Sequence, residues 1–319
     1  MLKIAVSSET TQKFCADLIQ HWKDSGHEVR YESGGAEYLA QWADVYYVEW
    51  ATNNIRYLYK HYHDSLEVTH GPEFDINKKP LFICRIFDWD VWIGWARDQA
   101  LIDWVDKWVC IAPHIESKLR KEADYGDKLS LIRPGINTEK FGLKTKETDG
   151  FQLGMVLGDM WTYKNHMAGL DIFTSLSHLD DRWRLHVRGQ HEPGEYNPVM
   201  FEHYLESRGI RDKVTLYPPQ DDMNAWYENI DHLLHPGMKE AFSYAVGEAM
   251  SKGIHVVCNE FFGSRDIWPN YILYQTHDEA VKKLMVYAYK QFPQVNREYI
   301  VNNYSNEKMF TEFDKLLSP

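Results

Sequence analysis

The feature that most restricts the fold of this sequence is the repeated alternation of short apolar runs with segments of helical periodicity. A short apolar run between polar or glycine residues is typical of a buried strand, whereas apolar residues spaced three and four apart are typical of a helix. In residues 11–25, for example, Phe14, Leu18 and Trp22 fall on one helical face. Strand-like runs lie at residues 3–6, 27–31, 44–50, 80–87, 107–112 and 128–132, and again at 151–157, 183–187, 213–217, 232–235 and 254–258. This alternation predicts an α/β architecture of parallel sheets covered by helices.

A polar segment divides the two series of runs. Residues 142–150 lack periodicity and are bounded by glycines, which indicates an interdomain linker. We therefore expect two Rossmann-like domains, at residues 1–144 and 150–300, and a final amphipathic helix within 301–319 that crosses back to the first domain. Two such sheets are expected to face a central cleft with their carboxyl ends, where open α/β sheets bind ligands.

The composition of the chain bears on its partners and on its cellular location. The 319 residues carry 35 basic and 47 acidic side chains, a net charge of −12, so binding of nucleic acid is disfavoured. No uncharged apolar stretch approaches the roughly 18 to 20 residues that cross a bilayer, although peripheral membrane contact stays open. The cysteines form no CxxC pair, so we expect buried, reduced thiols in a cytoplasmic protein: Cys15, Cys84, Cys110 and Cys258.

The most informative stretch runs from His235 to Asn259. A strand is expected to end at Pro236, and a helix to begin near Ser243, whose hydroxyl can cap it. Free N–H groups at a helix start, together with the helix dipole, favour an anion such as a diphosphate. Glu240 precedes this helix and Glu248 lies within it, so two carboxylates flank the anion position. Carboxylates accept hydrogen bonds from paired sugar hydroxyls.

Residues 240–257, E-A-F-S-Y-A-V-G-E-A-M-S-K-G-I-H-V-V, resemble the donor-binding signature of a known family. Retaining nucleotide-sugar glycosyltransferases of GT-B fold, family four, carry E-G-F-G-x-x-x-x-E-A-M-A-x-G-x-P-V-V at this place. Four further stretches are similar to motifs of that family in the same order: residues 26–29, 105–119, 133–141 and 158–166, the last reading G-D-M-W-T-Y-K-N-H. The resemblance covers nearly the whole chain and is firmer after residue 105.

The resemblance implies transfer of a sugar from a UDP- or GDP-sugar to a glycan or other hydroxyl acceptor. Configuration would be retained, no metal or other cofactor would be needed, and the leaving diphosphate would take the acceptor proton. Glu240 would hold the donor sugar, Glu248 the ribose hydroxyls and Lys164 the diphosphate. The implied donor site also includes Gly158, Phe242, Ser243 and Tyr244.

Two departures from the family pattern affect the predicted site. The family's loop arginine is replaced by Asp159, and we hypothesise that Arg188, at the end of a strand, supplies the missing charge. A histidine that many members carry after the fourth strand is replaced by Phe87. The residues then expected to face the acceptor are Arg85, Asp88, Trp89 and Asp90.

Other interpretations stay open at this stage. The departures also fit a protein of the same fold that binds a glycan or nucleotide sugar without transfer, and the architecture also fits a nucleotide-sugar epimerase. An oxidoreductase is disfavoured because the dinucleotide fingerprint is absent. The Asp88-Trp89-Asp90 triplet imitates a metal-binding motif of another glycosyltransferase fold, and we interpret that match as accidental in a parallel architecture.

Overall fold

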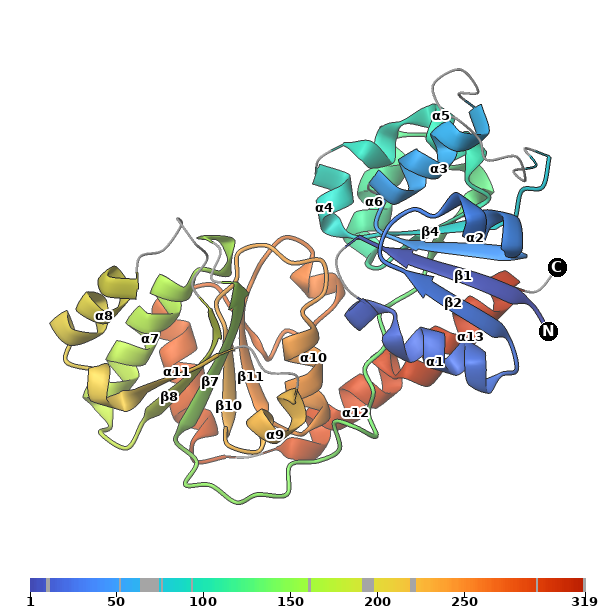
Figure 1. The fold of residues 1–319 in the computed structure, drawn as a ribbon. Helices are drawn as coiled ribbons and strands as arrows, with labels where there is room; N and C mark the ends of the chain where they lie inside the picture. The colour runs from blue at the N-terminus through green and yellow to red at the C-terminus, as the bar shows by residue number, and fades with distance from the viewer. Residues whose placement is uncertain are drawn as a thin grey trace. The chain divides into compact units, whose positions relative to one another are not determined.

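The computed structural model describes residues 1–9, 12–51, 53–63, 75, 77–92, 94–159, 162–190, 198–218, 222–290 and 292–317. Contacts divide the chain into two compact units (Figure 1), Met1–Gly135 with Asn306–Pro319, and Ile136–Ser305. Each unit contains a six-stranded sheet in which every described pairing is parallel. The predicted α/β architecture with two Rossmann-like sheets is therefore confirmed.

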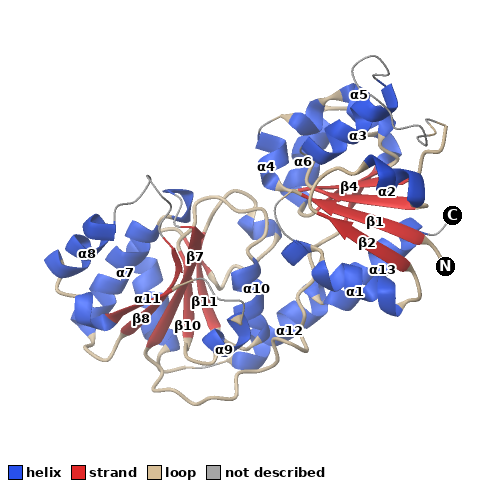
Figure 2. Ribbon diagram, viewed as in Figure 1, coloured by secondary structure: helices blue, strands red, loops and turns tan. Residues whose placement is uncertain are grey.

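The first unit has the strand order β2-β1-β3-β4-β5-β6. Its strands are β1 (Lys3–Ser8), β2 (Glu28–Glu32), β3 (Val45–Glu49), β4 (Leu81–Ile86), β5 (Lys107–Cys110) and β6 (Leu129–Leu131). Its helices are α1 (Ala16–Asp24), α2 (Glu37–Trp42), α3 (Asn53–His63), α4 (Asp88–Trp92), α5 (Gln99–Trp104), α6 (Pro113–Glu122) and α13 (Asn306–Leu317). Helices α1 and α13 cover one face of this sheet (Figure 2), where Trp22, Tyr47 and Phe313 pack edge to face.

The second unit has the strand order β12-β11-β10-β7-β8-β9. Its strands are β7 (Gln152–Asp159), β8 (Arg184–Gln190), β9 (Val214–Tyr217), β10 (His232–His235), β11 (His255–Asn259) and β12 (Leu273–Tyr274). Its helices are α7 (His166–Leu179), α8 (Pro198–Ser207), α9 (Met223–Tyr227), α10 (Tyr244–Ser251), α11 (His277–Tyr287) and α12 (Pro293–Tyr304). A core of aliphatic and aromatic side chains, including Leu153, Phe173 and Trp183, lies between the sheet and helices α7, α8 and α11.

Two further findings concern the thiols and the helices. All four cysteines are free and buried, which confirms the predicted buried thiols. Within the described ranges, none of the helices combines the length and apolarity that a bilayer crossing requires.

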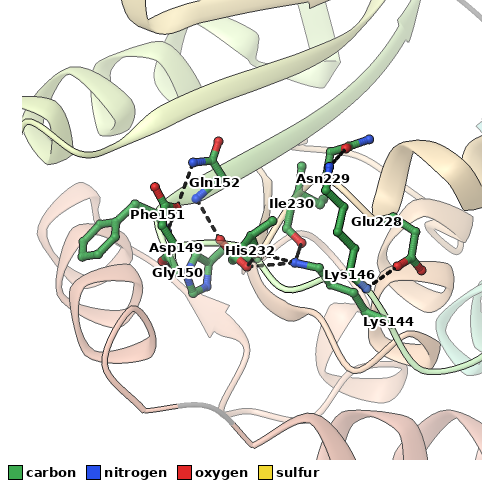
Figure 3. Close-up of polar contacts among 12 residues, drawn as sticks. Lys144, Lys146, Asp149, Gly150, Phe151, Gln152, Glu228, Asn229, Ile230 and His232 are labelled. Carbon is green, nitrogen blue, oxygen red and sulfur yellow. Dashed lines mark hydrogen bonds and ion pairs between the residues drawn. The ribbon is translucent and has the colours of Figure 1, made fainter.

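The segment expected to be a linker is bonded into the second unit instead (Figure 3). Lys144 Nζ lies 2.9 Å from Asp231 Oδ1 and donates to Ile230 O at 2.9 Å. His232 Nε2 lies 2.9 Å from Gly150 O, at the amino end of β10. The predicted limits of 1–144, 150–300 and 301–319 therefore differ from the observed division. Residues 136–149 belong to the second unit, and residues 293–304 form its helix α12.

Glu228 connects residues 142–150 to the end of α10, through contacts that require its carboxylate to be ionised. Its Oε2 accepts hydrogen bonds from the backbone N–H groups of Thr145 and Lys146, and Lys252 Nζ lies 2.5 Å from Oε1. Burial alone would raise the pKa of Glu228, but the hydrogen bonds from Lys252, Lys146 and Thr145 lower it to about 2.

We expect Glu228→Gln to lower the free energy of unfolding at pH 7 by about 2 to 3 kcal/mol. Because the folded pKa lies below the unfolded value of about 4.3, this stabilisation is present above that pH and is lost as the pH falls toward 2. Urea unfolding of both proteins between pH 7 and pH 3 measures the difference. Glu147→Gln, an exposed position in the same segment, is the matched control. A deficit that does not shrink on acidification would contradict the assignment.

Candidate functional site

The order of the strands places the candidate site at the carboxyl ends of the central strands of the second sheet. Strand β7 comes first in the chain and lies between β8 and β10, so the chain winds in opposite directions from it. Open α/β sheets bind ligands at the carboxyl ends of the strands beside such a switch point. The segments that leave β7 and β10 there are bonded to each other, because Met238 N donates to Tyr163 O at 2.9 Å and Asn165 Nδ2 donates to Pro236 O at 3.3 Å.

Unusual backbone geometry shapes the segment after β7. Gly158 lies at a register shift in β7 with φ of 60°, and Asn165, which precedes α7, has φ of 52°. Glycine, and to a lesser degree asparagine, adopts such left-handed conformations at low cost. Gly158, one of the residues assigned to the donor site, is exposed. The Asp159 side chain and residues 160–161 lie outside the described part of the chain.

Lys164 and Glu240 form an ion pair beyond the carboxyl ends of β7 and β10. Lys164 Nζ lies 2.5 Å from Glu240 Oε1, and the side chains are 21% and 14% exposed. His235, the last residue of β10, places Nε2 3.7 Å from the same carboxylate oxygen. Burial, and then the charge of Lys164, lowers the pKa of His235 to about 3, so its imidazole is neutral. The two residues assigned to the sugar and the diphosphate are thus brought together.

Glu248 belongs to a second group of polar side chains, between α10 and α9. Tyr227, at the end of α9, donates its hydroxyl to Glu248 Oε2 at 3.0 Å. Burial, and next the charge of Glu248, raises the pKa of Tyr227, so this hydroxyl remains a donor. Arg188 is 3% exposed, lies 6.0 Å from the Trp226 ring and adds positive charge near Tyr227. It sits two residues before the end of β8, rather than at the strand end as predicted.

The start of α10 differs in one detail from the prediction. Ser243 is the N-cap residue, but its side chain forms no capping hydrogen bond to the described residues. Phe242 is 6% exposed and packs against Trp268 and Tyr304 at ring distances of 5.0 and 5.2 Å. Phe242 therefore anchors the turn in the core of the unit, and half-buried Tyr244 begins the helix.

The residues expected to face the acceptor in the first unit are largely internal. Arg85 is fully buried, with Nη1 3.2 Å from Glu49 Oε1. Asp90 is also fully buried, and its Oδ2 accepts from the backbone N–H of Phe87 at 2.8 Å. Burial raises the pKa of Asp90 to about 7. Asp88 is half-buried, and the Trp89 side chain lies outside the described part. Arg85 and Asp90 were expected to face an acceptor, but in this structure both side chains are buried and make internal contacts.

Three residues of these groups were not predicted. His235 and Tyr227 carry no motif of their own, and their roles arise from contacts between separate elements. Glu49 had a usable signal, because an acid ending one buried strand and Arg85 near the end of the next become neighbours in a parallel sheet.

The second unit matches a known family model, and the fold of the whole chain matches that of solved structures. Residues 152–287 match the family model described as Glycosyl transferases group 1. Among solved structures, the sucrose-phosphate synthase of Thermosynechococcus elongatus superposes with a TM-score of 0.76 at 12% identity, covering 99% of this chain and 98% of that one. Anabaena Alr3699/HepE, solved in complex with UDP and glucose, gives a TM-score of 0.74 at 11% identity and covers 99% of both chains.

A third structure is longer than this chain. TarM gives a TM-score of 0.67 at 13% identity over 86% of this chain, which spans 55% of the TarM chain. No curated protein matches the sequence. Together the comparisons place the whole chain in the GT-B fold of glycosyltransferases, with a second unit that matches the group 1 glycosyl transferases.

Proposed function

We propose that the protein is a retaining glycosyltransferase of family four that moves a sugar from a UDP- or GDP-sugar to a hydroxyl acceptor. The observation that carries the proposal is the Lys164–Glu240 ion pair at the switch point, within the residues that match the group 1 model. One structural neighbour, Alr3699/HepE, has been solved with UDP and with UDP-glucose, which supports a nucleotide-sugar donor here.

The chemistry follows from charge placement. Lys164 Nζ and the N–H groups at the start of α10 are proposed to hold the diphosphate, and Glu240 to accept from hydroxyls of the donor sugar. The bond between the anomeric carbon and the diphosphate oxygen breaks, and the acceptor oxygen forms its bond on the same face. The leaving oxygen takes the acceptor proton, so atoms and charge balance. Catalysis then depends on positioning and on stabilising the leaving charge.

Glu248 is proposed to bind the ribose of the donor, and Arg188 to add charge that stabilises its diphosphate. Glu248 holds the ribose hydroxyls, and the Tyr227 hydroxyl fixes its carboxylate at 3.0 Å. Arg188 supplies positive charge in place of the family arginine. Because Lys164, Arg188 and the helix start provide this counter-charge, we propose that the reaction needs no metal.

A nucleotide-sugar panel tests the proposal. Purified protein is mixed with UDP-glucose, UDP-galactose, UDP-N-acetylglucosamine and GDP-mannose, and its unfolding temperature is measured. A donor at 100 times its Kd adds about 2.7 kcal/mol of stability. NMR of the product with the binding donor then gives the anomeric configuration. Binding without hydrolysis or transfer would indicate the non-catalytic alternative, reversible conversion of the donor without acceptor would indicate an epimerase, and an inverted product would contradict retention.

Replacing Arg188 separates its role from that of Asp159. We expect Arg188→Ala to raise the donor KM or lower kcat by about 30-fold or more, because a charge-assisted hydrogen bond contributes about 2 kcal/mol. Asp159→Ala should change both constants by less than about threefold, since removing a carboxylate cannot weaken diphosphate binding through charge. Steady-state kinetics with the binding donor measures both variants, and Arg188→Lys controls for charge. A mild Arg188→Ala with a strong Asp159→Ala would refute the assignment.

A further inference from the structure

His235 presents a buried donor or acceptor that is not satisfied within the described part of the chain. Its side chain is 4% exposed, and Nε2 has no hydrogen-bond partner among the described residues. Leaving a buried polar atom unpaired costs about 1 to 3 kcal/mol, so such an atom calls for an explanation. Oε1 of Glu240 lies 3.7 Å from Nε2, just beyond hydrogen-bonding distance.

The backbone keeps the space between the imidazole and the carboxylate open. A Cβ atom at Gly237 would lie 3.0 Å from His235 Nε2 and 3.8 Å from Glu240 Oε1. Asn259 Nδ2 donates to Gly237 O at 3.1 Å and holds this turn against the end of β11. The imidazole and the carboxylate can therefore approach each other without moving a side chain from between them.

Among the described residues, Glu240 has one close charged partner, Lys164. Lys164 Nζ lies 2.5 Å from the same Oε1 atom that faces His235. If Lys164 binds a diphosphate, as the proposed function requires, its ammonium is drawn toward the new anion and the carboxylate loses that partner. A shift of about 1 Å then brings Nε2–H of His235 into hydrogen-bonding range of Oε1.

We propose that His235 is a positioning residue that receives the Glu240 carboxylate when Lys164 turns to the donor diphosphate. This inference rests on the proposed function and adds an exchange of partners to it. The neutral imidazole donates one hydrogen bond to Oε1, and Oε2 remains available to a sugar hydroxyl. The carboxylate is thus held in place in both states of the site.

The test compares His235→Phe with His235→Gln, which keeps an N–H donor. Donor hydrolysis is measured with UDP-glucose and GDP-mannose, and nucleotide binding with UDP and GDP. We expect His235→Phe to lower kcat by about 10- to 100-fold, as the loss of a hydrogen bond to a charged group implies. The Kd of the nucleotide should change less than about threefold, because neither UDP nor GDP carries the sugar that Glu240 holds. His235→Gln should recover most of the activity.

His232→Phe is the matched control, because it is a second buried histidine on β10, bonded at the opposite end of the strand. We expect it to lower the unfolding temperature without changing kcat. In the wild-type protein, ¹⁵N NMR should show the Nε2 resonance of His235 moving on addition of the nucleotide that binds, which tests the exchange even where a variant folds poorly.

The outcomes separate the two proposals. Full kcat in a folded His235→Phe, or an Nε2 resonance that stays fixed when UDP or GDP binds, would overturn the exchange and leave the proposed function standing. A wild-type protein that binds none of these four compounds would overturn the proposed function and the exchange together.

Discussion

Glu240→Gln is expected to reduce donor hydrolysis and sugar transfer by about 100- to 1,000-fold, a loss of about 3 to 4 kcal/mol of transition-state stabilisation. Glutamine has nearly the same shape, so the turn before α10 should keep its conformation. It cannot carry the charge that holds Lys164 at 2.5 Å. It also presents one acceptor oxygen in place of two, so bonds to sugar hydroxyls are lost where the reaction needs them.

The measurement is the release of UDP or GDP from the donor that the wild-type protein binds. Glu312→Gln is the matched control, because Glu312 also pairs with a lysine at 2.5 Å but lies on α13 with 49% of its side chain exposed. We expect the control to retain full activity. A Glu240→Gln protein with more than about a third of the wild-type kcat/KM would show that the ion pair stabilises the turn and does not act on the donor.

The layered fold could be predicted because its signal is local. Strand β4, for example, begins with an uninterrupted apolar run from Leu81 to Cys84, and the helices between strands carry apolar residues on one face. Burial on both faces of a parallel sheet requires that pattern. The sequence also contained the information needed to predict that Lys164 and Glu240 lie close together, because they follow β7 and β10, which are neighbours in the sheet.

The parts that could not be predicted depend on contacts distant in sequence. Residues 142–150 are polar and aperiodic, as a linker would be, yet Lys144 and Asp231 bind each other across 87 positions. Arg85 is charged and lies near the end of an apolar strand, and Asp90 follows that strand, so their polarity indicated an exposed site. Arg85 is buried against Glu49 on the neighbouring strand, a partner 36 positions away.

Arg85→Met is expected to destabilise the first unit by about 3 to 5 kcal/mol, the usual cost of removing one partner of a buried ion pair. Arg85 and Glu49 have fully buried side chains, and Glu49 Oε1 also accepts from the Tyr47 hydroxyl at 2.7 Å. Methionine would leave the Glu49 carboxylate without its cationic partner in an apolar core. The guanidinium also lies 5.7 Å from the Phe313 ring, so its loss weakens the contact between the sheet and α13.

The double variant Arg85→Met with Glu49→Gln separates charge from packing. Because neither charge remains buried, we expect it to recover more than half of the lost stability, measured by urea unfolding. Lys315→Met, which breaks an exposed pair in the same unit, should cost less than about 1 kcal/mol. Transfer activity of the double variant then tests the predicted acceptor role. If Arg85 acts through packing alone, a folded double variant transfers sugar with an unchanged acceptor KM. A raised acceptor KM with an unchanged donor KM would instead show that the guanidinium reaches the acceptor despite its burial.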